Sequence, residues 1–314
     1  MQKKRLGVIG VGYLGKFHAQ KYAQMETADL VAVVDADLET AKKIAEENGA
    51  EAYTDYKDMI DKVDAVSIAT PTSYHYEVAK DFINAGKDLM IEKPITVTVE
   101  EADELVELAD KKGVIIQVGH LEQFNPAMVA ARAHIDNPRF IESHRLSFFK
   151  GRGADVSVVL DLMIHDIEII LSLVGSGVKN ISASGATIIT DNIDLASARI
   201  DFENGCAANV TVSRVSKDQM RKIRFFQHDK FISLDFGEQI VGILKKSDRV
   251  VDGIPQIDEE QVQVEKSDAL YEELASFVDC VIERKEPLVT GKAGRDALKV
   301  AHDVIDHIKS TLNP

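Results

Sequence analysis

The chain has 314 residues, of which 45% are hydrophobic, and its formal net charge at pH 7 is −15. This length predicts two domains, and the acidic surface repels nucleic acid and anionic membranes, so neither is an expected partner. Two cysteines, no membrane-length apolar run and no signal peptide argue against a disulfide framework, a cysteine-rich zinc site and a membrane span, and favour a cytoplasmic protein.

Short apolar segments alternate with helical patterns in the first third of the chain. This alternation predicts right-handed crossovers and a parallel sheet covered on both faces. The expected strands are 5–10, 30–35, 64–70, 87–92 and 113–119. The expected helices are 13–26, 37–48, 73–85 and 98–112. We therefore expect an α/β Rossmann domain over residues 1–120.

The sequence GVGYLG joins the first expected strand to the first expected helix, and its Gly10, Gly12 and Gly15 fit the pattern G-x-G-x-x-G. Glycine at these positions permits a tight turn, the approach of the backbone to a pyrophosphate, and close packing of helix on strand. The free N–H groups of the helix N-terminus then face the phosphates. We expect this turn, with Tyr13 and Leu14, to bind a dinucleotide; the alternative is that the glycines serve only a turn.

Asp35 ends the second expected strand, about 20 residues after Gly15, which is the spacing of a carboxylate that binds the ribose diol. Ala36 and Asp37 follow, and no arginine is nearby to receive a 2′-phosphate. The sequence therefore favours NAD over NADP.

Two further segments lie at the carboxyl ends of expected strands, where ligands bind in an open parallel sheet. They are ATPTSYH (69–75) and EKP (92–94). We expect them to contribute cofactor contacts from Thr70, Pro71, His75, Glu92 and Lys93. A solvated loop lysine is the alternative for Lys93, and a simple strand terminator is the alternative for Pro94.

The pattern changes after residue 119. Helices are expected at 124–135, 157–175, 270–284 and 294–310, one strand at 140–150, and six short strands between 178 and 245. This predicts an α+β domain over residues 121–314 with a large, mostly antiparallel open sheet. Its last helix, 294–310, is a candidate to pack back on the first domain. The acidic stretch 258–265 is expected as a solvated loop or an edge strand.

The segment 157–175 is apolar nearly all round, which predicts a helix buried on most sides. Asp161, His165, Glu168 and Ser172 nevertheless form one polar stripe along it. In one interpretation this stripe is the exposed face of the helix. In the other, Asp161 and His165 face a cleft, where the carboxylate orients the imidazole for proton transfer. A metal site is not expected, because this pair supplies two ligands and the spacing offers no third.

Four motifs together resemble the Gfo/Idh/MocA oxidoreductases over nearly the whole chain. They are GVGYLG, the strand-end Asp35, EKP at 92–94 and DLMIHD at 161–166. The resemblance implies a Rossmann domain joined to an α+β domain whose open sheet forms oligomer contacts, here those of a homodimer or homotetramer. It also implies hydride transfer between NAD and the hydroxyl of a sugar or cyclitol. The family's E-K-P lysine and Asp-x-x-x-His pair match Lys93, Asp161 and His165, which become the catalytic candidates.

Two segments are similar to the branch of this family that oxidises the 3-hydroxyl of UDP-N-acetylglucosamine. They are VGHLEQFNPA (118–127) and VVLDLMIHDIEIILSLVG (158–175). The resemblance implies substrate contacts from Gln123 and Asn125 besides the catalytic candidates. The branch usually has arginine where this chain has Gln123, so binding through charge is not implied there.

A UDP-sugar also needs cations for its diphosphate. The segment HRLSFFKGRG (144–153) offers Arg145, Lys150 and Arg152 just before the helix that carries the polar stripe. Ordinary surface cations are the alternative interpretation.

For the reaction, we expect His165 to act as the base and Lys93 to donate to the reacting oxygen, while Asp161 orients His165 or holds a sugar hydroxyl. Lys93 stays an alternative base, because a desolvated lysine can also take the proton. The rival functions are a free sugar or inositol dehydrogenase and a nonenzymatic NAD-binding sensor.

Overall fold

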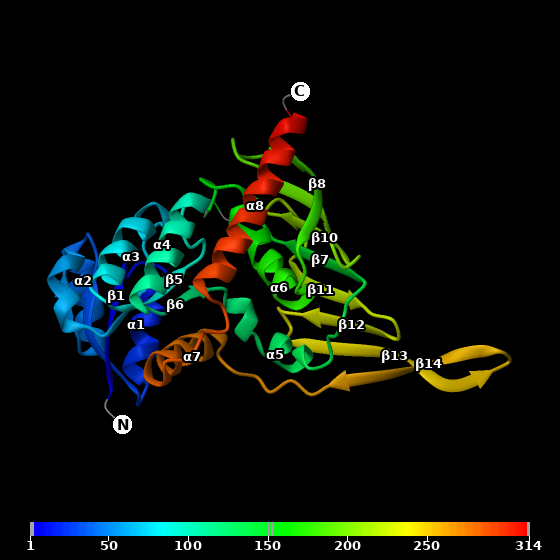
Figure 1. Cartoon of the computed structure of the whole chain (residues 1–314), viewed down its shortest axis with the longest axis horizontal. Coiled ribbons are helices and arrows are strands. Elements are labelled where there is room, and N and C mark those ends of the chain that lie inside the picture. Colours follow the sequence, from blue (N-terminus) through cyan, green and yellow to red (C-terminus); the bar gives the residue numbers. More distant parts are fainter. Residues whose placement is uncertain (1–2, 150, 152, 313–314) are drawn as a thin grey trace. The chain divides into compact units, whose positions relative to one another are not determined.

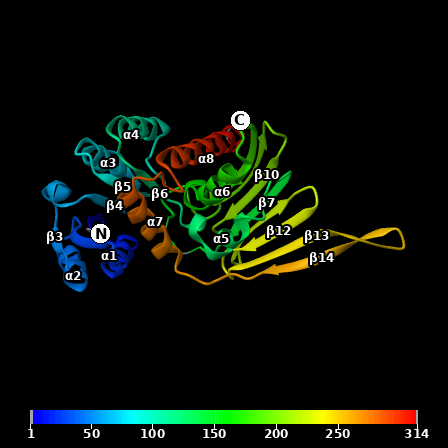
Figure 2. The ribbon, with the colours of Figure 1, turned by 60° about the horizontal axis from the view of Figure 1, so that its bottom comes forward.

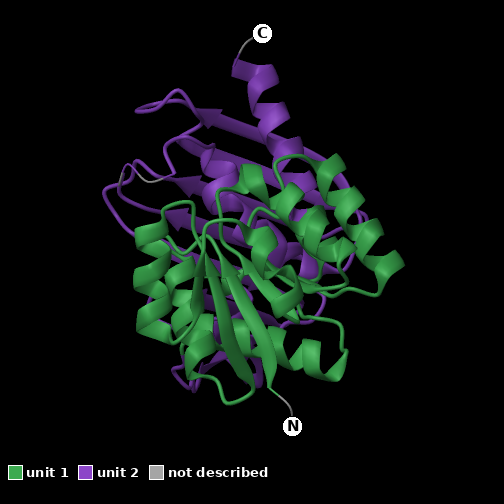
Figure 3. Cartoon of the chain, turned by 90° about the vertical axis from the view of Figure 1, so that its left-hand side faces the viewer, with its two compact units in different colours: residues 1–121, 268–296 green, residues 122–267, 297–314 purple. Residues whose placement is uncertain are grey.

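The computed structural model describes residues 3–149, 151 and 153–312, and it divides into two compact units (Figure 3). The first unit comprises residues 1–121 and 268–296, and the second comprises residues 122–267 and 297–314. The sequence places residues 268–296 in the second domain, whereas the structure packs them in the first unit. The first unit is therefore built from two separate stretches of the chain.

The first unit is built on a six-stranded parallel sheet. The strand order is β3-β2-β1-β4-β5-β6, which is the order of a Rossmann fold. Its strands are β1 (Lys4–Ile9), β2 (Ala28–Val34), β3 (Glu51–Tyr53), β4 (Ala65–Ile68), β5 (Asp88–Glu92) and β6 (Ile116–Gly119). The strand β3 was not expected from the sequence, because this three-residue edge strand has no fully buried residue.

Helices cover both faces of this sheet. They are α1 (Gly15–Gln24), α2 (Leu38–Asn48), α3 (His75–Asn84), α4 (Val99–Lys112) and α7 (Ala269–Glu283). Figure 2 shows α3 and α4 on one side of the strands and α1 and α2 on the other. The helix α7 joins α1, since Leu274 and Phe277 share a buried core with Ala19 and Tyr22. This shared core is why the late segment belongs to the first unit.

The second unit is built on an eight-stranded sheet of the order β14-β13-β12-β11-β7-β10-β9-β8. The pair β7 and β10 is parallel and the other neighbours are antiparallel, as expected. The strands are β7 (Phe140–Leu146), β8 (Val178–Ala186), β9 (Leu195–Phe202), β10 (Ala207–Ser213), β11 (Met220–Phe226), β12 (Lys230–Asp235), β13 (Ile240–Val251) and β14 (Ile254–Val262).

One face of this second sheet is covered by helices and the other is open (Figures 1 and 2). The covering helices are α5 (Pro126–Arg132), α6 (Ile164–Val174) and α8 (Gly291–Leu312). From Ala297 onward α8 belongs to the second unit, and its Val304 and Ile308 are buried in the core there. The last helix therefore contributes only its first turns to the first unit, contrary to the alternative in which it packs back there as a whole.

The strands β13 and β14 form a long hairpin at one edge of the sheet, with its turn at Asp252 and Gly253 (Figure 1). The first half of the acidic stretch 258–265 lies in β14, which confirms the edge-strand alternative for that half. Among the residues that the structure describes, no helix is both long and apolar enough to cross a membrane.

Candidate active site

The glycine turn between β1 and α1 is shaped by close backbone contacts. Gly10 has a φ of +81°, and a Cβ atom there would lie 2.8 Å from the backbone nitrogen of Thr70. A Cβ atom on Gly15 would lie 1.8 Å from the carbonyl oxygen of Gly10. A Cβ atom on Gly12, in contrast, would meet no protein atom within 4 Å. The backbone at Gly12 is thus open to a ligand, which is the property that a pyrophosphate requires.

Asp35 directly follows β2 and turns its carboxylate toward this glycine turn. Its Oδ2 atom accepts a hydrogen bond from the backbone N–H of Val11 at 3.0 Å, and its Oδ1 atom accepts one from Asp37 at 3.1 Å. A carboxylate has about four lone-pair sites, so acceptor capacity is left for a ribose diol. Asp37 instead caps α2 and accepts from Thr40. Gly12 and Asp35 therefore fit a dinucleotide.

The two other residues of the turn differ in exposure. Tyr13 is 63% exposed and packs edge-on against Phe17, and Leu14 is half-buried at the start of α1. The Tyr13 side chain is thus accessible at the surface of the turn, whereas that of Leu14 is partly covered.

Glu92 and Lys93 stand at the carboxyl end of β5, and the peptide bond between Lys93 and Pro94 is cis. The Oε1 atom of Glu92 lies 3.0 Å from Nε2 of His18, a fully buried residue of α1. Burial acts to raise the pKa of Glu92, but the hydrogen bond with His18 and the charges of His18 and Lys93 outweigh it and hold this pKa below its usual value. Glu92 is therefore an anion beside the Lys93 ammonium.

His75 bridges the two strand-end turns of this unit. Its Nδ1 atom lies 2.9 Å from the carbonyl oxygen of Pro94, and its Nε2 atom lies 2.9 Å from that of Thr70. The side chain is 99% buried, and burial lowers its pKa. Both ring nitrogens are thus engaged by the backbone, so His75 shapes the turns instead of contacting the cofactor directly as expected. Thr70 is half-buried and Pro71 is exposed at the same edge.

His120 lies at the same edge of the sheet and was not predicted from the sequence as a site residue. It directly follows β6 and is buried, and burial together with the charge of Lys93 lowers its pKa to about 3. It is therefore a neutral imidazole near Lys93. Its position after a strand end was the available signal, because the same rule had selected Thr70 and Glu92.

In the second unit, Asp161 and His165 lie where a π-turn (Val159–Met163) leads into α6. The sequence predicted one continuous α-helix here, but the N–H of Ile164 bonds to the carbonyl of Val159, five residues back. Such turns inside helices are frequent at functional sites. Asp161 and His165 are both half-buried.

The polar stripe along this helix is exposed only at Ser172. Glu168 is only 2% exposed, and burial raises its pKa to about 7 against the opposing effects of Gln123 and Arg132. The stripe as a whole is therefore not the exposed face of the helix; only Ser172, its last member, is exposed. Among its members, Asp161 and His165 are the residues placed nearest the start of the helix.

Gln123 is buried and fully engaged within the second unit. Its Nε2 atom donates to Glu168 at 2.6 Å and to Ser172 at 2.9 Å, and its Oε1 atom accepts from Arg132. The amide thus links α6 to α5, and it does not present a free group to a substrate as expected.

Asn125 is also structural. Its Oδ1 atom accepts from the N–H of Ala127 at 3.1 Å and so caps α5, while its Nδ2 atom donates to Glu122 and to the carbonyl of Phe236. The sequence predicted a substrate contact here because the residue lies in a motif of the family. The structure shows instead that the motif builds the start of a helix.

Of the three cations expected at the diphosphate site, the structure describes only Arg145. Arg145 is buried and donates two hydrogen bonds to Asp166, at 2.9 and 3.1 Å, and one to Glu122 at 2.7 Å. It anchors α6 on β7, so the expectation that it meets a diphosphate is wrong. Lys150 and Arg152 lie outside the described residues. Within the part of the chain that is described, no group of three or more His, Cys, Asp or Glu side chains is placed to hold a metal ion.

Comparison with known proteins decides the family. Residues 4–120 match the model of the oxidoreductase family with an NAD-binding Rossmann fold, and residues 127–228 match the GFO/IDH/MocA C-terminal domain. The UDP-N-acetylglucosamine 3-dehydrogenase of Acidithiobacillus ferrooxidans is 38% identical over 301 residues, which cover 96% of each chain. The chain belongs to the Gfo/Idh/MocA oxidoreductase family.

Two further comparisons place the chain within the Gfo/Idh/MocA oxidoreductases. The scyllo-inositol 2-dehydrogenase (NAD(+)) of Bacillus subtilis is 30% identical and covers 91% of this chain and 88% of its own. A solved structure of the Acidithiobacillus ferrooxidans enzyme superposes with a TM-score of 0.94 at 37% identity over the full length of both chains. The predicted fold class, the NAD cofactor and the activity of a dehydrogenase acting on CH–OH groups are confirmed.

Proposed function

We propose that this oxidoreductase oxidises a secondary hydroxyl of a nucleotide sugar with NAD, namely the 3-hydroxyl of a UDP-N-acetylhexosamine. The observation that carries the proposal is the near full-length match in sequence and structure to a UDP-N-acetylglucosamine 3-dehydrogenase. Lys93, Asp161 and His165 stand at the positions that the family motifs assign to catalysis, which supports the same chemistry.

In the proposed reaction, bound NAD supplies the acceptor for the hydride. His165 takes the proton of the substrate hydroxyl, and Lys93 donates a hydrogen bond to the same oxygen as negative charge develops on it. Asp161 orients the imidazole or holds a neighbouring sugar hydroxyl. Lys93 is the alternative base, and a neutral His120 beside it adds no positive charge that competes for the oxygen.

The proposed cofactor site comprises the glycine turn and the strand ends of the first unit. The open backbone at Gly12 receives the pyrophosphate, and Asp35 accepts from the ribose hydroxyls. Tyr13 and Leu14 flank the pyrophosphate, and Thr70, Pro71, Glu92 and Lys93 face the nicotinamide half. His75 supports this edge through Thr70 and Pro94.

The diphosphate of the substrate is assigned to Lys150 and Arg152. Binding of UDP is the measurement that tests this assignment, since UDP carries the diphosphate without the sugar. The variant in which both cations are replaced by glutamine should bind UDP at least tenfold more weakly at low salt. Unchanged UDP affinity in that variant would exclude the two cations.

A free sugar or inositol dehydrogenase is the second candidate. It is favoured by the similarity to a scyllo-inositol 2-dehydrogenase. Gln123 does not bear on this choice, because its amide is buried and links Glu168 of α6 to Arg132 of α5.

A substrate panel tests both candidates. Formation of NADH is followed by absorbance at saturating NAD with UDP-N-acetylglucosamine, UDP-N-acetylgalactosamine, N-acetylglucosamine, scyllo-inositol and myo-inositol. The proposal expects kcat/KM for a UDP-sugar to exceed that of every free sugar and inositol by at least 100-fold. A preference for an inositol would establish the second candidate instead.

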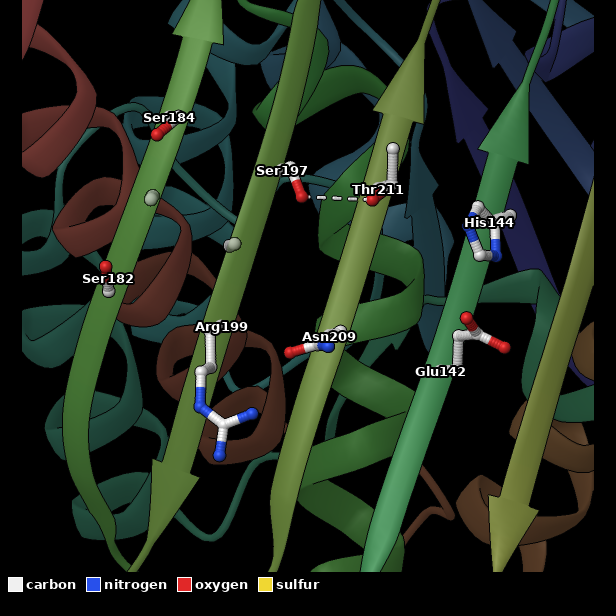
Figure 4. Close-up of a pocket in the computed structure, with 10 residues that line it drawn as sticks. Glu142, His144, Ser182, Ser184, Ser197, Arg199, Asn209 and Thr211 are labelled. Carbon is white, nitrogen blue, oxygen red and sulfur yellow. Dashed lines mark hydrogen bonds between the residues drawn. The ribbon is translucent and has the colours of Figure 1, made fainter.

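We also propose that two or four copies assemble through the open face of the second sheet. Phe226 on this face lies 5.7 Å from Phe140 and 5.0 Å from Phe231, ring centre to ring centre, and all three are half-buried. Beside them is a shallow polar pocket of about 430 Å³, in which Ser197 hydrogen-bonds to Thr211 at 3.1 Å (Figure 4). Half-buried aromatic rings next to hydrogen-bonding groups are typical of protein interfaces.

The oligomeric state tests this assembly. Phe226→Asp should reduce the molar mass measured by light scattering. Val129→Asp, which introduces the same charge at an exposed apolar residue of α5, should leave the molar mass unchanged.

We also propose a cytoplasmic location. Both cysteines, Cys206 and Cys280, are free and buried, as in a reducing compartment.

A further inference from the structure

The second unit contains a buried ion pair, Asp194 and Arg214, for which the proposed reaction has no use. Both side chains are almost completely buried, and the Nε atom of Arg214 lies 3.8 Å from Oδ1 of Asp194. Burying two charges is costly unless further hydrogen bonds satisfy them. The hydrogen-bond partners of the two side chains therefore show which parts of the fold this pair holds together.

Asp194 organises the loop between β8 and β9. Its Oδ2 atom accepts from the backbone N–H groups of Ile188, Ile189 and Thr190 at 2.8, 2.7 and 2.9 Å, and its Oδ1 atom accepts from the Thr190 hydroxyl at 2.8 Å. Burial acts to raise the pKa of Asp194, but these donors outweigh it and lower this pKa to about 2. Asp194 is therefore ionised at neutral pH, and its hydrogen bonds hold the backbone of residues 188–190 in place.

Arg214 connects Asp194 to a second loop, which contains residues 153–156. It directly follows β10, and its backbone N–H bonds to the carbonyl of Asp194 at 3.0 Å. Its two terminal nitrogens donate to the carbonyl oxygens of Gly153 and, at 2.6 Å, Val156. One guanidinium thus holds two carbonyls of the segment 153–156, which leads into the π-turn.

The segment 153–156 lies against the carboxylate of Asp161. Gly153 has a φ of +71°, and a Cβ atom there would lie 2.9 Å from Oδ2 of Asp161. The segment is also tied to the β8–β9 loop, because Asn192 donates to the carbonyl of Ala154 at 3.1 Å. Two residues after the segment, the N–H of Val158 donates to the carbonyl of Ile193 of the same loop at 2.9 Å. The backbone of Gly153 therefore limits where the Asp161 carboxylate can lie.

We propose that Arg214, held by Asp194, is a positioning residue that fixes the segment 153–156 and through it the carboxylate of Asp161. This inference rests on the proposed function only for its effect on turnover. Its structural part, that Arg214 orders the segment beside Asp161, stands independently.

The main variant is Arg214→Gln, which removes the charge and at least one of the two carbonyl contacts. Arg284→Gln is the matched control. Arg284 also joins a buried aspartate, Asp88, to a loop carbonyl, that of Gly113, but does so at the amino end of β5, away from the residues proposed for cofactor and catalysis. Arg214→Lys is the conservative variant; it keeps the charge opposite Asp194 and reaches one carbonyl, and it serves if the glutamine variant does not purify folded.

The first measurement is hydrogen exchange of the amides between 153 and 164. Arg214→Gln should accelerate exchange there at least tenfold, Arg214→Lys should do so less, and Arg284→Gln should leave these amides at the wild-type rate. Wild-type exchange in this segment in both Arg214 variants would overturn the inference, whatever the substrate proves to be.

The second measurement is steady-state kinetics on the substrate that the panel selects. A displacement of about 1 Å in a catalytic group costs about 100-fold in rate, so kcat should fall on the order of 30- to 100-fold in Arg214→Gln while KM and the Kd for NADH change less than threefold. Arg214→Lys should recover at least part of this loss. A raised KM at unchanged kcat, or an equal loss in Arg284→Gln, would contradict the positioning role.

The two failures are distinguishable. If the wild type oxidises no compound of the panel, the proposed function fails, and hydrogen exchange alone decides the role of Arg214. If the wild type is active and Arg214→Gln exchanges faster but keeps its kcat, the proposed function stands and the coupling to Asp161 is excluded.

Discussion

His18 on α1 and Glu92 at the end of β5 form a buried pair, with 3.0 Å between Nε2 of the imidazole and Oε1 of the carboxylate. The pair connects the helix that begins at the glycine turn with the residue that precedes Lys93. The two halves of the proposed cofactor site in the first unit are thus joined by one hydrogen bond. Its partners are 74 residues apart in the sequence.

Loss of this hydrogen bond should destabilise the protein. His18→Ala leaves the largely buried carboxylate of Glu92 without its partner, which costs about 1–3 kcal/mol in the free energy of unfolding by urea at pH 7. The folded-state pKa of Glu92 lies below its unfolded value, so its stabilisation is present above about pH 4.5 and is lost as the pH falls through the folded pKa. The penalty of His18→Ala should therefore shrink as the pH falls below about 4.5. His228→Ala, in the exposed β11–β12 turn, is the control, and a comparable loss in both variants would contradict this role.

Gly12 and Gly10 should respond differently to alanine. Gly12→Ala adds a methyl group where no protein atom is within 4 Å, so the melting temperature of the ligand-free protein should stay unchanged while NADH binds on the order of tenfold more weakly. Gly10→Ala forces a positive φ on alanine and a contact with Thr70, and it should lose at least about 1–2 kcal/mol of stability. NADH fluorescence and thermal melts measure both. Wild-type affinity in Gly12→Ala would remove this residue from the pyrophosphate site.

Lys93→Met keeps the length of the side chain and removes the ammonium. Because Lys93 is proposed to act on the reacting oxygen, turnover should fall by at least about 1,000-fold while the Kd for NADH changes less than a few-fold. Pre-steady-state absorbance separates the loss of hydride transfer from slow product release. Retained turnover would show that Lys93 takes no part in the chemistry.

Glu168 should make stability depend on pH. Burial raises its folded pKa to about 7, above the unfolded value, so the folded state holds a proton that the unfolded state releases. Its contribution is therefore favourable at low pH and is lost as the pH rises from about 4.5 through 7, with a total of at most about 3 kcal/mol. Glu168→Gln should flatten the fall in melting temperature between pH 5 and 8.5 and gain stability at the upper end.

The control for this prediction is Glu238→Gln, which removes the same charge from an exposed turn. It should leave the pH dependence of the melting temperature as in the wild type. Equal curves for the wild type and Glu168→Gln would show that Glu168 is ionised in the folded protein throughout this range.

Short-range features of the sequence predicted the fold and the cofactor turn well. The glycine spacing, the strand-end Asp35 and the alternation of strands and helices are local patterns, and they appear in the structure as β1, β2 and α1 with the contacts that the pattern requires. The open sheet of the second unit also follows from period-two patterns. These features depend on residues close to one another in the chain, which is why they can be read directly.

The predictions failed for residues whose roles depend on hydrogen-bond partners far away in the sequence. Gln123 and Asn125 lie in a family motif, but Glu168, Ser172 and Phe236 bind them, and these are 45 to 111 residues away. Arg145 belongs to a basic segment but faces the covered side of its strand, where Asp166 meets it. The π-turn before α6 was also missed, because a single extra residue in a helical turn leaves the apolar pattern almost unchanged.

The position of α7 bears on how the protein is made. Its Leu274, Phe277, Val278 and Val281 belong to the core that α1 and β1 begin, although about 250 residues separate the two segments. During synthesis the earliest strands therefore emerge without one of the helices that covers them, and the nascent sheet keeps an apolar surface exposed until most of the chain has left the ribosome. A ribosome-bound fragment that ends near residue 260 should consequently be more sensitive to protease within α1 than the finished protein.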